Sequence, residues 1–177
     1  MPHPRIYVAS LADYNAGRLH GAWIDADQEP EQLSDAVQAM LAKSRQPGAE
    51  EWAIHDYDGF GAYRLGEYHR LEDVAALAAG ISEHGLAFAA WAEQASLDTE
   101  RLERFDDAYL GHFGSVETYA EDWLDESGAN ELLDKLPSWL RPYVNLDVAG
   151  FARDLQLGGD ITCAPDETGV HIFDATI

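Results

Sequence analysis

The chain has 177 residues, enough for one ordinary domain or two to three small ones, and its 5 Trp, 8 Tyr and 6 Phe can supply a core. It carries 33 Asp and Glu against 11 Lys and Arg, a formal net charge of -22. The aromatic content argues against a disordered acidic tail. The negative charge argues against direct binding to nucleic acid or to an anionic membrane, because phosphate contacts need Lys and Arg, and it favours a basic protein partner.

The N-terminal residues lack the apolar stretch of a signal peptide, and no run reaches the ~18 apolar residues of a membrane span, so we expect a soluble cytoplasmic protein. The one cysteine, Cys163, stands in the strand-like run D-I-T-C-A. It cannot form an internal disulfide and lacks the C-x-x-C spacing of zinc or redox sites. We interpret it as a small buried hydrophobic residue.

The first third of the chain predicts a small α+β domain over residues 1–61. The expected elements are strands at 5–10, 18–25 and 51–57, a loop with Asn-Ala-Gly turn chemistry at 11–17, and a helix that begins at Pro30. In the third strand, simple alternation places Trp52, Ile54 and Asp56 on one side and Ala53, His55 and Tyr57 on the other.

The middle third is rich in Ala and predicts short helices, broken at Gly85 and near Ser96, that form a small bundle over residues 62–104. Residues 105–177 predict a second α+β domain. Its expected elements are a strand at 108–113, helices at 116–127, 130–136 and about 146–156, and a terminal hairpin made of D-I-T-C-A and G-V-H-I-F-D-A. All three parts carry net negative charge, so acidity belongs to the whole surface.

The segment S-V-E-T-Y-A-E-D-W-L-D-E-S-G, residues 115–128, predicts an amphipathic helix that begins after the N-cap Ser115 and ends at Gly128. Its apolar face, expected to be buried, holds Val116, Tyr119, Ala120 and Trp123, with Leu124 at its edge. The opposite, solvent-exposed half holds Glu117, Glu121, Asp122, Asp125 and Glu126. Like charges four residues apart cost roughly 0.2–0.5 kcal/mol per pair, so stability alone does not favour this face.

Carboxylates at that spacing lie ~6 Å apart along the helix axis, comparable with phosphates on a nucleic-acid strand. Duplex DNA carries one charge per ~1.7 Å of axis, so the whole net charge corresponds to ~37 Å of duplex, and that of a dimer to ~75 Å. A generally solvated acidic surface, as in halophilic proteins, and plain drift toward acidity explain the composition as well.

Motifs for catalysis or metal binding are weak. Alternation separates His55 from Asp56 and Asp58, which is poor for one metal site, and no two of the seven histidines stand four apart on a helix. His20 and His112 are interpreted as structural histidines in strands. The chain has no G-x-S-x-G, Walker or G-x-G-x-x-G motif, and a close pair among 33 acids carries little information about a hydrolase. We therefore expect no catalytic site, no cofactor and no metal.

Five segments, quoted in chain order, resemble the ArdA antirestriction proteins. They are P-R-I-Y-V-A-S-L-A-D-Y-N-A-G-R-L-H-G-A-W-I-D-A (4–26), E-E-W-A-I-H-D-Y-D-G-F (50–60), Y-L-G-H-F-G-S-V-E-T-Y-A-E-D (109–122), F-A-R-D-L…G-D-I (151–161) and G-V-H-I-F (169–173). In the first segment, Asp13 and Tyr14 are either family signature or turn residues. The resemblance spans nearly the whole chain.

The resemblance implies an elongated homodimer of three-domain chains that mimics bent B-form DNA, with the C-terminal α+β part mediating dimerisation. Proteins of this family occupy the DNA-binding groove of type I restriction–modification enzymes and inhibit them, need no cofactor, and are carried on mobile genetic elements. The role falls to exposed carboxylates, among them Glu117, Glu121, Asp122, Asp125, Glu126, Glu131 and Asp134. An acidic adaptor that binds another basic protein through a local patch, 115–134, is the alternative.

Overall fold

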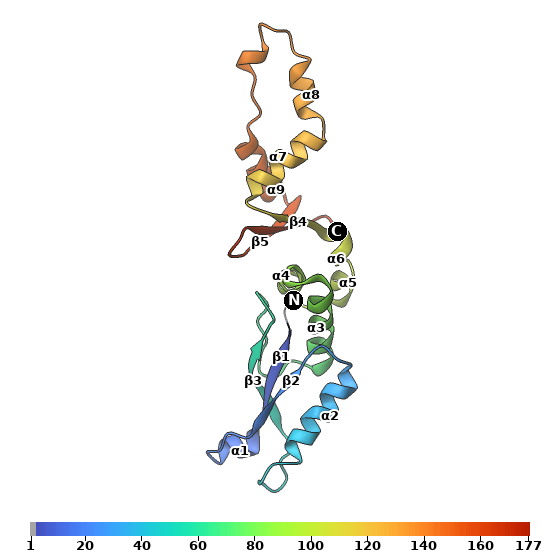
Figure 1. Ribbon diagram of the computed structural model, residues 1–177, viewed down its shortest axis with the longest axis vertical. Coiled ribbons are helices and arrows are strands. Elements are labelled where there is room, and N and C mark those ends of the chain that lie inside the picture. The colour runs from blue at the N-terminus through green and yellow to red at the C-terminus, as the bar shows by residue number, and fades with distance from the viewer. Residues whose placement is uncertain (1–2) are drawn as a thin grey trace. The chain divides into compact units, whose positions relative to one another are not determined.

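The computed structural model describes residues 3–177, apart from the side chain of Thr99. The chain divides into two compact units, Met1–Leu102 and Glu103–Ile177, each with its own three-stranded antiparallel sheet (Figure 1). The mixed α+β class is therefore confirmed. The first unit spans the predicted parts 1–61 and 62–104, and the division between those two stays a prediction.

The first unit begins with the sheet, in strand order β2-β1-β3. Its elements are β1 (Arg5–Ser10), α1 (Leu11–Asn15), β2 (Gly21–Asp25), α2 (Pro30–Leu41), β3 (Trp52–Asp58), α3 (Leu71–His84), α4 (Leu86–Ala95) and α5 (Thr99–Leu102). Helix α2 runs alongside the strands (Figure 1) and buries Leu33, Val37, Met40 and Leu41. His20 ties this helix to the start of β2, because its Nε2 lies 2.8 Å from the carbonyl oxygen of Met40.

Two sequence-based expectations for this unit are wrong. Residues 11–15 form helix α1 instead of a loop, because the Ser10 hydroxyl accepts a hydrogen bond from the backbone N–H of Asp13 and caps a helical turn. The alternation predicted in β3 fails because a bulge opposite Tyr7 and Val8 inserts His55 as an extra residue. Ala53 and Ile54 are consequently both buried.

Helices α3 and α4 pack closely at a glycine. A Cβ atom on Gly80 would lie 2.2 Å from the Phe88 ring, so only glycine leaves room for that ring. Helix α4 is buried nearly all round, and its Trp91 donates a hydrogen bond of 2.9 Å from Nε1 to the carbonyl oxygen of Arg101. The break between the two helices falls at Gly85, as predicted.

The second unit has a sheet in strand order β4-β6-β5. Its elements are α6 (Phe105–Ala108), β4 (Tyr109–Phe113), α7 (Val116–Glu126), α8 (Ala129–Asp134), the 3₁₀ helix η1 (Arg141–Tyr143), α9 (Val148–Gly158), β5 (Ile161–Pro165) and β6 (Val170–Asp174). These confirm the predicted strand, the three helices and the terminal hairpin. Helices α7 and α9 pack on each other, and each contacts an edge strand of the sheet.

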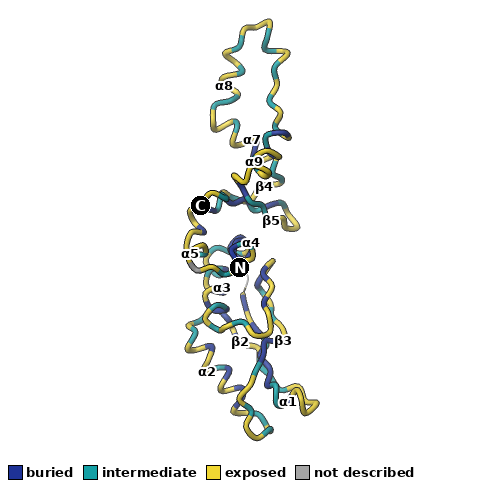
Figure 2. Tube along the Cα trace, turned by 180° about the vertical axis from the view of Figure 1, so that it is seen from behind, coloured by how far each residue is buried: buried dark blue, intermediate teal, exposed yellow. Residues whose placement is uncertain are grey.

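The core beneath these helices consists of Ile161, Val170 and Ile172. Cys163 packs against it but is half-buried, because it lies on an edge strand, so the expectation of full burial is wrong. Burial still raises the pKa of its thiol. By contrast, no residue from 121 to 149 is buried, and Figure 2 shows this stretch, which includes α8, without the dark blue of buried residues.

No helix within residues 3–177 combines the length and the apolar character needed to cross a membrane.

Candidate functional site

Helix α7 presents the acidic face predicted from the sequence. Its first turn is fixed by Ser115, whose Oγ accepts a hydrogen bond of 3.2 Å from the backbone N–H of Thr118. Its last turn ends at Ser127, and Gly128 follows with φ +78°. That left-handed conformation favours glycine and lets the chain turn directly into α8.

All seven predicted carboxylates of the acidic face are exposed: Glu117, Glu121, Asp122, Asp125 and Glu126 on α7, and Glu131 and Asp134 on α8. Asp134 is 3.7 Å from Nε of Arg141, and Asp125 accepts a hydrogen bond from the side-chain amide of Asn130. Among the residues that the structure describes, the other six form no ion pair with Lys, Arg or His.

The apolar face of α7 holds it on the second unit. Ala120 is fully buried, and the Tyr119 ring packs edge-on against Phe113 with 5.1 Å between ring centroids. Burial, and after it the charge of Asp174, raises the pKa of Tyr119. Trp123 contacts Phe151 with 5.1 Å between centroids but remains 44% exposed. The prediction that this whole face is buried is wrong at Trp123, because the core ends beneath the first two turns of the helix.

The rest of the surface is acidic as well. Of the 33 Asp and Glu residues, all but Asp13, Asp73 and Asp174 are exposed. The unit Glu103–Ile177 contains four Lys and Arg residues, namely Arg104, Lys135, Arg141 and Arg153. A surface with so few cations produces a strong and continuous negative field, which attracts a basic partner.

Asp13 is the buried exception. It is 2% exposed and accepts a hydrogen bond from the Ser44 hydroxyl, which, followed by the Ser10 contact, lowers the pKa of the Asp13 carboxyl. Asp13 thus anchors α1 to the segment after α2 and is no part of the acidic surface. Tyr14, its neighbour, is exposed and packs edge-on against the His55 ring at 5.0 Å.

The predicted polar cluster at residues 55–58 does not converge on one point. Asp58 pairs with Arg5 at 3.0 Å, and Asp56 accepts a hydrogen bond from the backbone N–H of Tyr57.

A different cluster was missed in the sequence: His112 on β4, His171 on β6 and Asp166 in the turn between β5 and β6 lie together. These residues are up to 59 positions apart in the sequence, so only the strand pairing brings them into contact. The appearance of one histidine in each of two predicted strands was the available signal.

The sequence profile of the family described as Antirestriction protein (ArdA) matches residues 6–169, almost the entire chain. The chain belongs to the ArdA family. The antirestriction assignment fits an acidic surface with no need for a catalytic centre, since ArdA is a family of inhibitor proteins and not of enzymes. Family membership also implies interaction with restriction–modification enzymes. No match among curated proteins was found.

Proposed function

We propose that this ArdA protein is a DNA mimic that occupies the DNA-binding groove of type I restriction–modification enzymes and thereby inhibits them. The observation that carries the proposal is the exposure of all but three of its 33 carboxylates in a protein of net charge -22. A groove that binds duplex DNA is lined by Lys and Arg, and it attracts any surface with a comparable density of negative charge.

The acidic face of α7 suits this role because its carboxylates are held on a capped helix. Glu117, Glu121 and Asp125 stand four residues apart, or ~6 Å along the axis. Such an array is ordered before binding, so little conformational entropy is lost when the groove closes on it. Because the charge is distributed, neutralising any one carboxylate has little effect on inhibition.

Self-association through the unit Glu103–Ile177 is part of the proposal. This unit exposes four large apolar side chains that its own core leaves uncovered: Leu132 (64% exposed), Trp139 (71%), Tyr143 (81%) and Leu157 (79%). Exposed apolar groups of this size favour burial against another surface. A homodimer doubles the length of duplex whose charge the protein matches. Light scattering of the wild type and of Trp139→Ala measures whether dimers form and weaken.

The decisive experiment measures displacement of a labelled DNA duplex from a purified type I restriction–modification enzyme at two salt concentrations. The proposal predicts displacement that weakens steeply as salt rises, with no binding of the protein to the duplex itself. Absence of displacement at low salt from several such enzymes would refute it.

Two matched variants separate a distributed mimic from a local adaptor. One neutralises Glu121, Asp122, Asp125 and Glu126 on α7. The other neutralises four exposed carboxylates of the first unit: Glu31, Asp35, Glu50 and Glu51. A mimic loses affinity in both variants, because each removes four charges. A complete loss confined to the α7 variant indicates an adaptor that binds a basic protein through the patch 115–134.

A further inference from the structure

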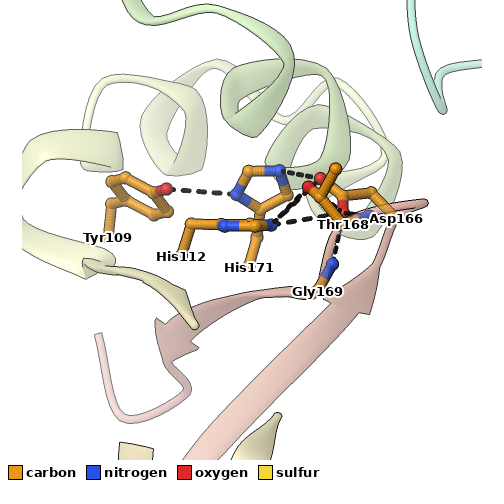
Figure 3. Close-up of polar contacts among 6 residues, drawn as sticks. All are labelled: Tyr109, His112, Asp166, Thr168, Gly169 and His171. Atoms are coloured by element: carbon orange, nitrogen blue, oxygen red, sulfur yellow. Dashed lines mark hydrogen bonds and ion pairs between the residues drawn. The ribbon is translucent and has the colours of Figure 1, made fainter. Parts of the chain in front are cut away.

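Three side chains with metal-ligating atoms converge on one face of the second sheet (Figure 3). His112 and His171 are direct register partners on β4 and β6, with ring centroids 4.7 Å apart. Asp166 reaches them from the turn that joins β5 to β6. One ligand atom from each residue lies within 4.8 Å of the others. Three separate elements therefore contribute to one cluster.

The spacing of these atoms fits a single ion. Nε2 of His112 is 3.1 Å from Oδ2 of Asp166, and Nε2 of His171 is 3.2 Å from the same oxygen. Ligands at 2.0–2.1 Å from a tetrahedral zinc ion are separated from one another by about 3.3 Å. A shift of a few tenths of an ångström places both nitrogens and the oxygen around one ion. We propose that His112, Asp166 and His171 form a binding site for a divalent transition-metal ion of the zinc class.

The surroundings hold the ligands in the required orientation. Oδ1 of Asp166 accepts hydrogen bonds from the backbone N–H groups of Thr168 (2.7 Å) and Gly169 (2.8 Å) and from the Thr168 hydroxyl (2.9 Å). The turn thus fixes one carboxylate oxygen and leaves Oδ2 facing the two imidazoles. Nδ1 of His171 lies 3.1 Å from the Tyr109 hydroxyl. Such a contact on the far ring nitrogen orients a metal-ligating histidine.

The protonation states also suit a metal. The backbone hydrogen bond from Thr168, with the others in the turn, holds the pKa of Asp166 well below its usual range. Burial, followed by the neighbouring His112, lowers the pKa of His171. A carboxylate and a neutral imidazole are the forms that bind cations, so little proton release opposes binding near neutral pH.

The donor set selects the class of ion. Two imidazole nitrogens and one carboxylate oxygen suit zinc and its transition-metal neighbours, whereas Mg²⁺ and Ca²⁺ prefer oxygen ligands. The His112 and Asp166 side chains are 32% and 37% exposed, so solvent reaches the cluster and water can complete the coordination. A bound ion would join the β5–β6 turn to both β4 and β6.

The test uses the untagged full-length protein after treatment with a chelator, because a histidine tag would bind the same ions. Zinc binding is measured by competition with a chromophoric chelator, and cobalt binding by its visible absorption, which reports nitrogen ligands directly. We expect one zinc per chain. His112→Gln and Asp166→Asn each reduce affinity by at least about tenfold, and Tyr109→Phe, which keeps the ring, reduces it by about tenfold.

The matched control is His3→Gln. His3 pairs with Asp25 at 2.9 Å on the surface of the first unit, outside the cluster, and its replacement should leave affinity unchanged. Mg²⁺ serves as the control for general attraction of cations to the acidic surface. Circular dichroism in the presence of chelator shows that each variant is folded. Zinc binding no tighter than that of Mg²⁺, or affinity unaffected by His112→Gln in a folded variant, overturns the proposal.

Discussion

Neutralising the C-terminal half of the acidic face should stabilise the protein while weakening its inhibition. The variant Glu121→Gln, Asp122→Asn, Asp125→Asn and Glu126→Gln removes every like-charge pair at i, i+4 on α7, including that of Glu117 with residue 121. Three such pairs cost about 0.6–1.5 kcal/mol together. Removing negative charge from the C-terminal turn adds up to about 1 kcal/mol, because the helix dipole disfavours anions there.

The expected gain in free energy of unfolding is therefore about 1–2 kcal/mol at low ionic strength. For a cooperative unit of this size, that gain corresponds to a melting temperature raised by about 5–10 °C. Calorimetry in low salt measures it, and the same scan in 1 M NaCl is the control, because a Debye length of about 3 Å screens the repulsion. An unchanged or lower melting temperature in low salt would refute the assigned helix and its exposed face. Unchanged inhibition would refute the role of that face.

Three further perturbations test the fold. Gly80→Ala should lower the free energy of unfolding by about 1–2 kcal/mol, since its clash with the Phe88 ring outweighs the higher helix propensity of Ala, and it should have no such effect in a Phe88→Ala background. Ser115→Ala removes the N-cap of α7 and should cost about 1 kcal/mol in urea unfolding. The lowered pKa of Asp13 stabilises the folded state above about pH 4, and this contribution is lost as pH falls through the folded pKa. The stability difference between wild type and Asp13→Asn should therefore shrink in acid, and a constant difference down to pH 2 contradicts the contribution of Ser44.

Local sequence signals located most elements, because capping residues and hydrophobic periodicity act within a few positions. Ser115 and Gly128 bounded α7 correctly, and Gly85 marked the break between α3 and α4. Helix α1 was missed although its signal is local, since the capping pair Ser10 and Asp13 was outweighed by the turn residues that follow.

The remaining errors have tertiary causes. The bulge at His55 arises from pairing with β1, and the partial exposure of Trp123 reflects where the core of the second unit ends. The cluster of His112, Asp166 and His171 depends on the β4–β6 register, which no short-range pattern encodes. The acidic face could be predicted because exposure follows directly from helical geometry, whereas the partner of that face comes from family membership alone.

The stretch from 121 to 149, in which no residue is buried, has a consequence for how this protein can change. Substitution of a core residue commonly costs several kcal/mol, whereas a surface substitution usually changes stability by no more than about 0.5 kcal/mol. Selection can therefore rearrange the charges and side chains of this stretch with little effect on folding. Its amino acids are free to follow the surface of whatever partner they meet, while Ile161, Val170 and Ile172 preserve the fold.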